Sequence, residues 1–322
     1  MIDLLKKNGH FYKANLHSHS TVSDGKMTPL QMRDWYKAHG YSILSITDHS
    51  KYRIYPELQE EGDFLMIAGF EASAMICPDQ DNKPLKFKIC HMNFWAKDPE
   101  TSVLIEEPHV YEVGVLNRYV AAMKKNGWLC SLNHPGWSLQ TTEEVNGIQG
   151  IDAFEVYNNT SQLLDNNGDG QAHYALYLNS GNRAYAIATD DNHAGFDEDG
   201  QICAADDTCG GYIMISMPEL SYPCFVDAFE NGRFYASTGA EFRELYIDEE
   251  KDMLILECSP VRTVLVKGVH TLRAERLVAR DDSITHAEIP LEPIRKKEPF
   301  FRLEIVTSDR KRAYSQPYYF EE

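Results

Sequence analysis

The sequence predicts an α/β protein, with a barrel of the triosephosphate-isomerase type in residues 1–239 and a small all-β sandwich in residues 240–322. Three observations support this prediction. Apolar runs alternate with helical patterns in the first part, which is typical of a parallel sheet. Polar residues stand at the ends of the apolar runs, where barrels of this type place their functional groups. The last part alternates with period 2 and has no helical pattern.

The first predicted elements are a strand, a helix and a second strand. The first strand is the alternating run "FYKANLHSH", which the turn residues "SDG" follow. A helix is expected from Pro29, a residue type that often begins helices, to Gly40, a residue type that often ends them. The short β-branched run "YSILSITDH" predicts the next strand.

The same order continues through the first part. Helices are expected in "VLNRYVAAMKKNG" and "PCFVDAFENG". Further strands are expected in the runs "FLMIAGFEASAMI", "KFKICHMNFWA", "WLCSLNHPGW", "IDAFEVYNN", "RAYAIATDDNH" and "GGYIMISM". After residue 239 the strand patterns are "FRELYIDEEKDMLILECS", "RTVLVKGV", "ERLVARDDSITHAEIPL" and "FFRLEIVTSDRKRAYSQPYYF". These patterns predict a second domain of antiparallel strands.

Side chains of metal-binding type stand at or near the ends of the predicted strands. They are His17, His19, His49, Glu71, His91, His134, Asp191 and His193. Because the carboxyl ends of barrel strands meet on one face, six of the twelve histidines are expected to converge there. A single histidine at such a place is more often a hydrogen-bonded residue than a ligand. The prediction therefore depends on the whole set.

Composition indicates an ordinary globular protein, with 43% apolar and 25% charged residues. No run approaches about 20 apolar residues, and the N-terminal "MIDLLKKNGHFYK" lacks the features of a signal peptide. The seven scattered cysteines form no C-x-x-C pair, which suits free thiols. We therefore expect a cytoplasmic protein that does not span a membrane.

The formal net charge of −18 is concentrated in the first part of the chain. Residues 240–322 contain 17 acidic and 14 basic residues, and residues 1–239 contain 32 acidic and 17 basic ones. Binding of long nucleic acids depends on basic side chains that contact phosphates, so such a partner is disfavoured. Bound cations would offset part of the acidic excess.

Six motifs in order resemble the metal-binding motifs of the PHP (polymerase and histidinol phosphatase) superfamily of phosphoesterases. They are "HSHSTVSDG", "ITDH", "GFEASA", the "CH" at His91, "NHPGW" and "ATDDNH". The resemblance covers residues 10–235, and the C-terminal part resembles the sandwich appended to some PHP-like proteins. It implies a distorted (βα)7 barrel that binds two to three divalent ions, of which Zn, Mn and Fe suit histidine and carboxylate ligands.

The resemblance also implies how the ligands divide among the metals. One metal would be held by His17, His19, Glu71 and Asp191; a second by Glu71, His91 and His134, with Glu71 bridging; a third by Asp24, His49 and His193. In "TDDNH" either Asp190 or Asp191 could be the ligand, and we prefer Asp191 because Asp-x-His is the family spacing. Asp48 is expected to orient a ligand rather than to bind metal.

The implied activity is hydrolysis of a small phosphate ester by a hydroxide that bridges two metals. The expected catalytic residues are Glu71, Asp191 and His193. The expected substrate contacts are Lys51, Arg53 and Asn158.

Two alternatives remain open at this point. Metal-dependent amidohydrolases also begin with His-x-His, although they often have a lysine where this chain has Glu71. The second alternative is a non-catalytic metal-binding protein whose sandwich binds a partner. Whether the chain forms a homo-oligomer also stays open.

Overall fold

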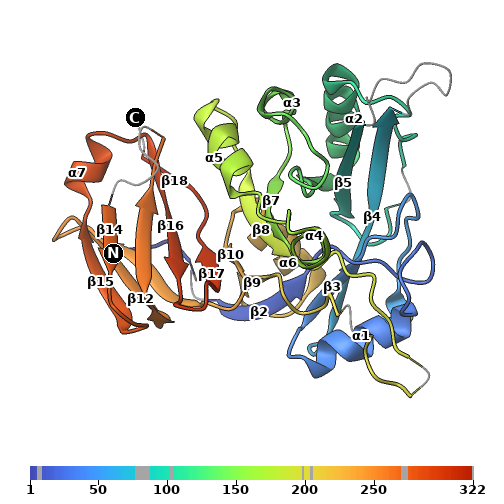
Figure 1. Ribbon diagram of the computed structural model, residues 1–322, viewed down its shortest axis with the longest axis horizontal. Helices are drawn as coiled ribbons and strands as arrows, with labels where there is room; N and C mark the ends of the chain where they lie inside the picture. Colours follow the sequence, from blue (N-terminus) through green and yellow to red (C-terminus); the bar gives the residue numbers. More distant parts are fainter. Residues whose placement is uncertain are drawn as a thin grey trace.

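The computed structural model describes residues 1–5, 9–76, 88–101, 104–197, 199–203, 206–269 and 275–320. Figure 1 shows two parts side by side, a larger part of strands and helices and a smaller part built mainly of strands. Both ends of the chain lie in the smaller part. Within the described ranges, no helix is long and apolar enough to cross a membrane.

Seven strands of the larger part are hydrogen-bonded to one another in the order of the sequence. They are β2 (His10–Asn15), β3 (Ile43–Ile46), β4 (Leu65–Ile76), β5 (Lys88–Ala96), β6 (Trp128–Leu132), β7 (Ala153–Asn158) and β8 (Tyr185–Thr189). β9 (Tyr212–Met217) pairs antiparallel with β2, and β10 (Phe234–Ser237) pairs antiparallel with β9. Every strand predicted before residue 239 is therefore present.

The closed barrel predicted from the sequence is not confirmed. Among the described strands, β8 pairs with β7 and not with β2. The two ends of the run meet only beyond the strands, through a bridge between Ser18 and Asn192. In addition, β5 is antiparallel to both β4 and β6.

The antiparallel strand β5 has a physical reason in the sequence. Parallel neighbours need a long crossover connection, usually a helix, whereas consecutive strands without one pair antiparallel. No helical pattern stands between "FLMIAGFEASAMI" and "KFKICHMNFWA". The larger part is therefore an α/β structure with a mixed sheet.

Helices connect many of these strands. In the described residues of the larger part they are α1 (Pro29–Ala38), α2 (Val113–Lys125), α3 (Thr142–Gly147), α4 (Asn159–Asp165), α5 (Gln171–Asn179), α6 (Tyr222–Glu230) and the 3-10 helix η1 (Pro56–Leu58). α1 begins at Pro29 as predicted, and Thr28 and Gln31 form a capping box at its start. The helices α3, α4 and α5 have no counterpart among the elements predicted from the sequence.

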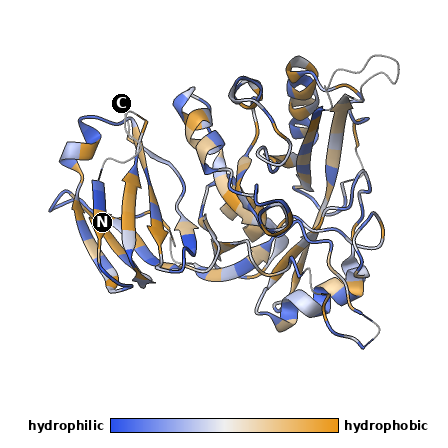
Figure 2. Cartoon of the chain, viewed as in Figure 1, coloured by the Kyte–Doolittle hydropathy of each residue, from blue (hydrophilic) through white to orange (hydrophobic). Residues whose placement is uncertain are grey.

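The smaller part is a sandwich of two antiparallel sheets, as the period-2 patterns predict. One sheet contains β1 (Ile2–Asp3), β11 (Phe242–Asp248), β12 (Met253–Val261) and β15 (Ile284–Pro290). The other contains β13 (Thr263–Lys267), β14 (Glu275–Val278), β16 (Phe300–Val306), β17 (Arg312–Tyr314) and β18 (Tyr318–Tyr319), and α7 (Glu292–Arg295) precedes β16. Apolar side chains of both sheets form one buried cluster. Figure 2 shows hydrophobic residues along several of these strands.

Continuous β-structure joins the two parts. β17 pairs with β10, so the second sheet of the sandwich continues into the strands of the larger part. The predicted boundary at residues 239/240 falls between β10 and β11. The division of the chain into two domains there stays a prediction.

Candidate metal centre

The nine residues predicted as metal ligands lie together in the larger part. Most follow the carboxyl ends of strands, and Glu71 and His91 lie within β4 and β5. Their ligand atoms form four groups, each within 4.8 Å: His17, His19 and Asp191; His17, Glu71 and His134; His49, Glu71 and His91; and His19, Asp24, His49 and His193. The grouping differs in part from the expected one, since His49 lies with Glu71 as well as with Asp24 and His19 joins the Asp24 group.

Glu71 lies at the middle of these groups. It is fully buried, and its carboxylate lies near five of the histidines. The distances are 3.1 Å to His17 Nε2, 3.5 Å to His19 Nε2, 2.8 Å to His49 Nδ1, 3.4 Å to His91 Nδ1 and 3.4 Å to His134 Nε2. The Asn133 side-chain amide donates a hydrogen bond to its Oε1 at 2.8 Å. One carboxylate can therefore face more than one cation.

Asp191 forms a second focus of the site. Its Oδ1 lies 3.0 Å from His17 Nε2 and 2.9 Å from His19 Nε2. Its backbone is in the left-handed region, with a φ of 56°, and its amide donates to the His17 carbonyl at 2.9 Å. A non-glycine residue in this conformation is strained, and such strain is common at functional sites.

The adjacent Asp190 points elsewhere. Its carboxylate accepts hydrogen bonds from the backbone amides of residues 209–211 and from the Tyr36 hydroxyl, all at 2.7–2.8 Å. Burial raises the pKa of Asp190 to about 7. In this geometry Asp191, and not Asp190, is the aspartate that faces the histidines.

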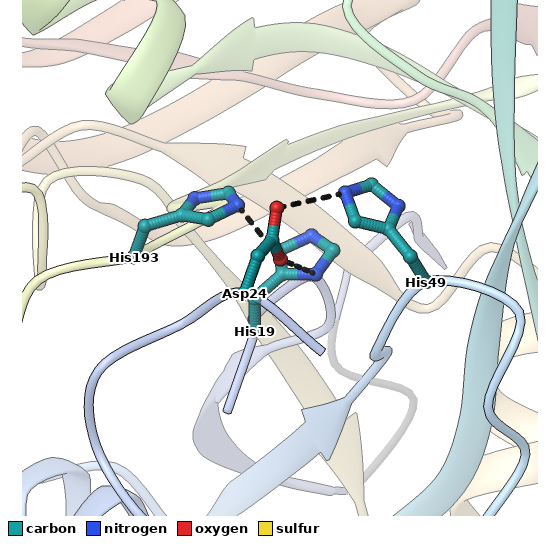
Figure 3. A group of neighbouring side chains, drawn as sticks. All are labelled: His19, Asp24, His49 and His193. Carbon is teal, nitrogen blue, oxygen red and sulfur yellow. Dashed lines mark ion pairs between the residues drawn. The ribbon is translucent and has the colours of Figure 1, made fainter. Parts of the chain in front are cut away.

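Asp24 and three histidines form the outermost group, which Figure 3 shows with the carboxylate between the rings. Its oxygens lie 3.7 Å from His19 Nδ1, 3.6 Å from His49 Nε2 and 3.5 Å from His193 Nε2. The Asp24 side chain is 54% exposed, so this group lies at the open side of the centre. Asp48 fixes the loop that leads into Asp24, because its carboxylate accepts hydrogen bonds from the Ser20 amide and the Ser23 hydroxyl.

The arrangement of lone pairs fits a bound cation. His17 Nδ1 lies 2.9 Å from Glu155 Oε1, so it is placed to donate there and to leave a lone pair on Nε2. That Nε2 faces a carboxylate oxygen of Glu71 and one of Asp191. His49 Nδ1 and Glu71 Oε2 lie 2.8 Å apart, yet both are buried and neither has a hydrogen-bond partner among the described residues. Two buried lone pairs that face one another are costly unless a proton or a cation lies between them.

The two central carboxylates have the protonation state that metal binding requires. Burial raises the pKa of Glu71, but His91 and His17 lower it more, and its pKa lies well below the usual value. The pKa of Asp191 is lowered in the same way, against burial, by His17 and His19. Burial lowers the pKa of His19 to about 4. Ionised carboxylates and a neutral imidazole are the forms that bind a metal. Against burial, the facing carboxylates raise the pKa of His17, His49 and His134, so a bound metal would displace protons from these rings.

Glu155, in β7, supports the centre and was not predicted from the sequence. It is buried, and besides His17 it accepts hydrogen bonds from the His134 backbone amide at 2.7 Å, from Asn158 Nδ2 at 3.0 Å and from the Thr189 hydroxyl. It therefore connects residues from four strand ends. The one sequence signal is a carboxylate inside the apolar run "AFEVYN", where a charge needs partners.

The three predicted substrate contacts differ in their burial. Asn158 is fully buried, and its amide donates to Asp191 Oδ2 and Glu155 Oε2 at 3.0 Å each, which places it in support of the ligands. Lys51 and Arg53 are exposed. Neither lines the cavity at the centre, which has a volume of about 160 Å³. The substrate-binding roles of all three stay predictions.

The described residues that line this cavity are mostly the candidate ligands. They are Asp24, His49, Glu71, His91, His134, Trp137, Thr160, Ser161, Asp191 and His193. Among the histidines outside the motifs, the described ones belong to no group with metal-binding spacing within the described residues. His270 and Cys77 lie outside the described residues. The six described cysteines are free thiols.

Comparison with known proteins gives matches only among solved structures. No protein-family model and no curated protein matches the chain. A two-domain protein from Bacteroides vulgatus ATCC 8482 that contains a predicted PHP-like metal-dependent phosphoesterase aligns over 99% of this chain and 97% of its own, with 16% identity and a TM-score of 0.48. A provisionally assigned metal-dependent phosphoesterase from Bifidobacterium adolescentis ATCC 15703 aligns over 58% of this chain and 89% of its own, with 14% identity and a TM-score of 0.40.

An amidohydrolase from Chromobacterium violaceum, solved with sulfate and without metal, is also similar. It aligns over 59% of this chain and 90% of its own, with 16% identity and a TM-score of 0.37.

Proposed function

We propose that this protein is a metal-dependent hydrolase that cleaves a small phosphate ester. The observation that carries the proposal is the buried Glu71 carboxylate, which lies within 3.5 Å of five histidines. Its ion-pair partners among the described residues are all histidines, as are those of Asp191. A buried carboxylate surrounded by imidazoles is the donor set of a multinuclear site rather than of a salt-bridged core.

The donors suit Zn, Mn or Fe, which accept imidazole nitrogen and carboxylate oxygen. His17, His19 and Asp191 would hold one ion, Glu71 would contribute to it and to a second with His91 and His134, and the Asp24 group would hold a third. Divalent cations bound there would supply positive charge for phosphate oxygens and would acidify a water molecule.

The chain's own residues have defined tasks in this proposal. Glu71 and Asp191 keep negative charge at the buried end of the cavity, where it balances the cations. Asn158 and Glu155 hold their ligand partners in one orientation. His193 Nδ1 lies 2.8 Å from the Asp191 carbonyl, which favours a proton on Nδ1 and presents Nε2 to the cavity.

The surroundings favour a small substrate with a phosphate group over a long nucleic acid. No lysine or arginine is among the described residues that line the cavity. Contacts to a polyphosphate backbone would need such residues around the site. A single phosphate needs only the cations themselves.

The proposal is tested by metal analysis and a substrate panel on the purified protein. We expect two to three divalent ions per chain and chelator-sensitive hydrolysis of an aryl phosphomonoester or phosphodiester. Hydrolysis of amides with no activity on phosphate esters would instead identify an amidohydrolase. Bound metal with no hydrolysis of either class would favour the non-catalytic alternative, and absence of metal after reconstitution would refute the proposal.

A ligand variant and a control variant test whether metal binding and hydrolysis depend on the candidate centre. His17→Ala combined with His19→Ala removes two ligands of the innermost group and should reduce both metal content and hydrolysis. His286→Ala is the control, because His286 lies on β15 of the sandwich and pairs with Glu257. This control should keep the metal content and activity of the unmodified protein.

A further inference from the structure

Trp137 occupies an unusual position for a tryptophan of this protein. Trp95 and Trp128 are completely buried, and Trp35 is partly buried. Trp137 is 38% exposed and lines the cavity of the candidate metal centre. It stands three residues after His134, in the loop between β6 and α3. An exposed indole at the mouth of a polar cavity is an apolar surface available to a ligand.

The indole is held in a fixed orientation. Its Nε1 donates a hydrogen bond to Asp165 Oδ2 at 3.1 Å. Its ring packs against the His134 ring at 5.0 Å and the His91 ring at 5.8 Å between centroids. The loop itself is tied to the segment that follows α4, because Asn167 Nδ2 donates to the Gly136 carbonyl at 2.7 Å. A side chain that is already ordered loses little entropy when a ligand packs on it.

The cavity is too small to enclose a complete substrate. Its volume of about 160 Å³ is below the about 300–1,000 Å³ that is usual for sites enclosing a drug-sized ligand. Cations and a phosphate group would fill it. The rest of the substrate must then leave through the mouth, where Trp137 lies.

The other lining residues indicate what this part of the substrate is. Apart from the candidate ligands and Trp137, the described lining residues are Thr160 and Ser161. The Thr160 hydroxyl is already engaged, at 2.7 Å from the Asp191 carbonyl and 2.9 Å from Asp207 Oδ2. Ser161 is buried, so a ring with many hydroxyl groups would find few hydrogen-bond partners here. A planar aromatic ring needs only the face of the indole.

We infer that Trp137 forms a subsite for the leaving group and that the substrate is a phosphate ester with an aromatic ring stacked on this indole. The inference rests on the proposed phosphoesterase function, because the phosphate must be bound at the metals for the ring to reach Trp137. Trp137 acts here as a specificity-determining residue.

The test compares two substrate analogues that cannot be hydrolysed, phenylphosphonate and methylphosphonate, by titration calorimetry on the full-length Mn²⁺-loaded protein. We expect phenylphosphonate to bind about tenfold more tightly, since stacking of two aromatic rings can raise the affinity by about this factor. Trp137→Ala should abolish this preference, so that the two analogues bind this variant with about equal affinity. Trp137→Phe should retain most of the preference.

Leu139→Ala is the matched control, because Leu139 lies in the same loop, is 81% exposed and does not line the cavity. It should leave both affinities unchanged. A preference for phenylphosphonate that persists in Trp137→Ala would overturn the subsite while leaving the phosphoesterase proposal intact. Failure of the metal-loaded protein to bind either phosphonate would overturn both.

Discussion

Individual residues of the candidate centre could be predicted from sequence when a chemical motif marked them. His17 and His19 alternate on a strand, and His134, Asp191 and His193 follow apolar runs, so residue type and position together indicated ligands. Glu155 could not be predicted in this way. It has no motif of its own, and its importance arises from contacts with residues 21 to 138 positions away. Supporting residues of this kind depend on the folded geometry.

The first prediction concerns Glu155. Glu155→Gln keeps the shape of the side chain but removes the charge that orients the His17 ring through Nδ1. Loss of such a supporting contact typically weakens metal binding by about 10- to 100-fold. Competition with a chromophoric chelator measures the change. Glu143→Gln, an exposed glutamate in α3, should leave the affinity unchanged; an equal loss in both variants would contradict the role assigned to Glu155.

The second prediction separates the neighbouring aspartates. Asp190→Ala leaves three backbone amides without their acceptor, whereas the Tyr36 hydroxyl keeps Asn192 Oδ1 at 2.8 Å, and should lower the free energy of unfolding by about 3 kcal/mol. Asp191→Ala removes a ligand and should lower metal content without a comparable loss of stability in the metal-free protein. Denaturant unfolding and elemental analysis of both variants decide this. The opposite pattern would make Asp190 the ligand.

At the scale of elements, the sequence predicted strands better than the way they pair. Apolar periodicity identified the strands β2 to β9, because buried positions of a strand require apolar side chains and so leave a pattern in the sequence. The open mixed sheet could not be predicted from the same signal, because closure depends on whether β8 meets β2. α4 and α5 were also missed. α5 lacks a polar face with helical periodicity, and α4 is a short helix that begins at Asn159, directly after β7.

The third prediction concerns the loop between β2 and α1, which carries Asp24. A Cβ atom on Gly25 would lie 2.0 Å from the His19 carbonyl oxygen, so the loop must move if any side chain is added. Gly25→Ala should therefore displace Asp24, lower the metal content and cost about 1–3 kcal/mol of stability. Gly114→Ala, in the exposed part of α2, is the control and should be neutral or gain about 0.5–1 kcal/mol. Unchanged metal content in Gly25→Ala would contradict this account.

At the scale of the whole molecule, the sandwich supports the larger part without lining its site. All described residues that line the cavity lie between positions 24 and 193. The sandwich instead supplies β17 as the neighbour of β10, and Tyr235 of β10 is buried in the apolar cluster of the sandwich. The charge and strand patterns of residues 240–322 indicated a module without metal chemistry. They did not indicate that its sheet continues into the larger part.

Gln316, from the C-terminal part of the chain, connects the sandwich to strands of the larger part by side-chain hydrogen bonds. It is almost completely buried, and its Oε1 accepts a hydrogen bond from the Ala186 amide at 2.6 Å. Its Nε2 donates to the Ala186 carbonyl at 3.0 Å and to the Phe234 carbonyl at 3.1 Å. The side chain therefore satisfies backbone groups of both β8 and β10, two strands that do not pair with each other.

The last prediction follows from this contact. Gln316→Ala leaves three buried backbone groups unpaired and should lower the free energy of unfolding by about 2–4 kcal/mol, while metal content stays unchanged. Gln201→Ala, at an exposed position, should have no effect. A chain ending at Thr238 loses Gln316 and β17 together and exposes Tyr235, so we expect it to be poorly soluble. If that shortened chain is instead soluble and keeps its metals but loses activity on every substrate, the sandwich must contribute to catalysis, because stability alone would not explain the loss.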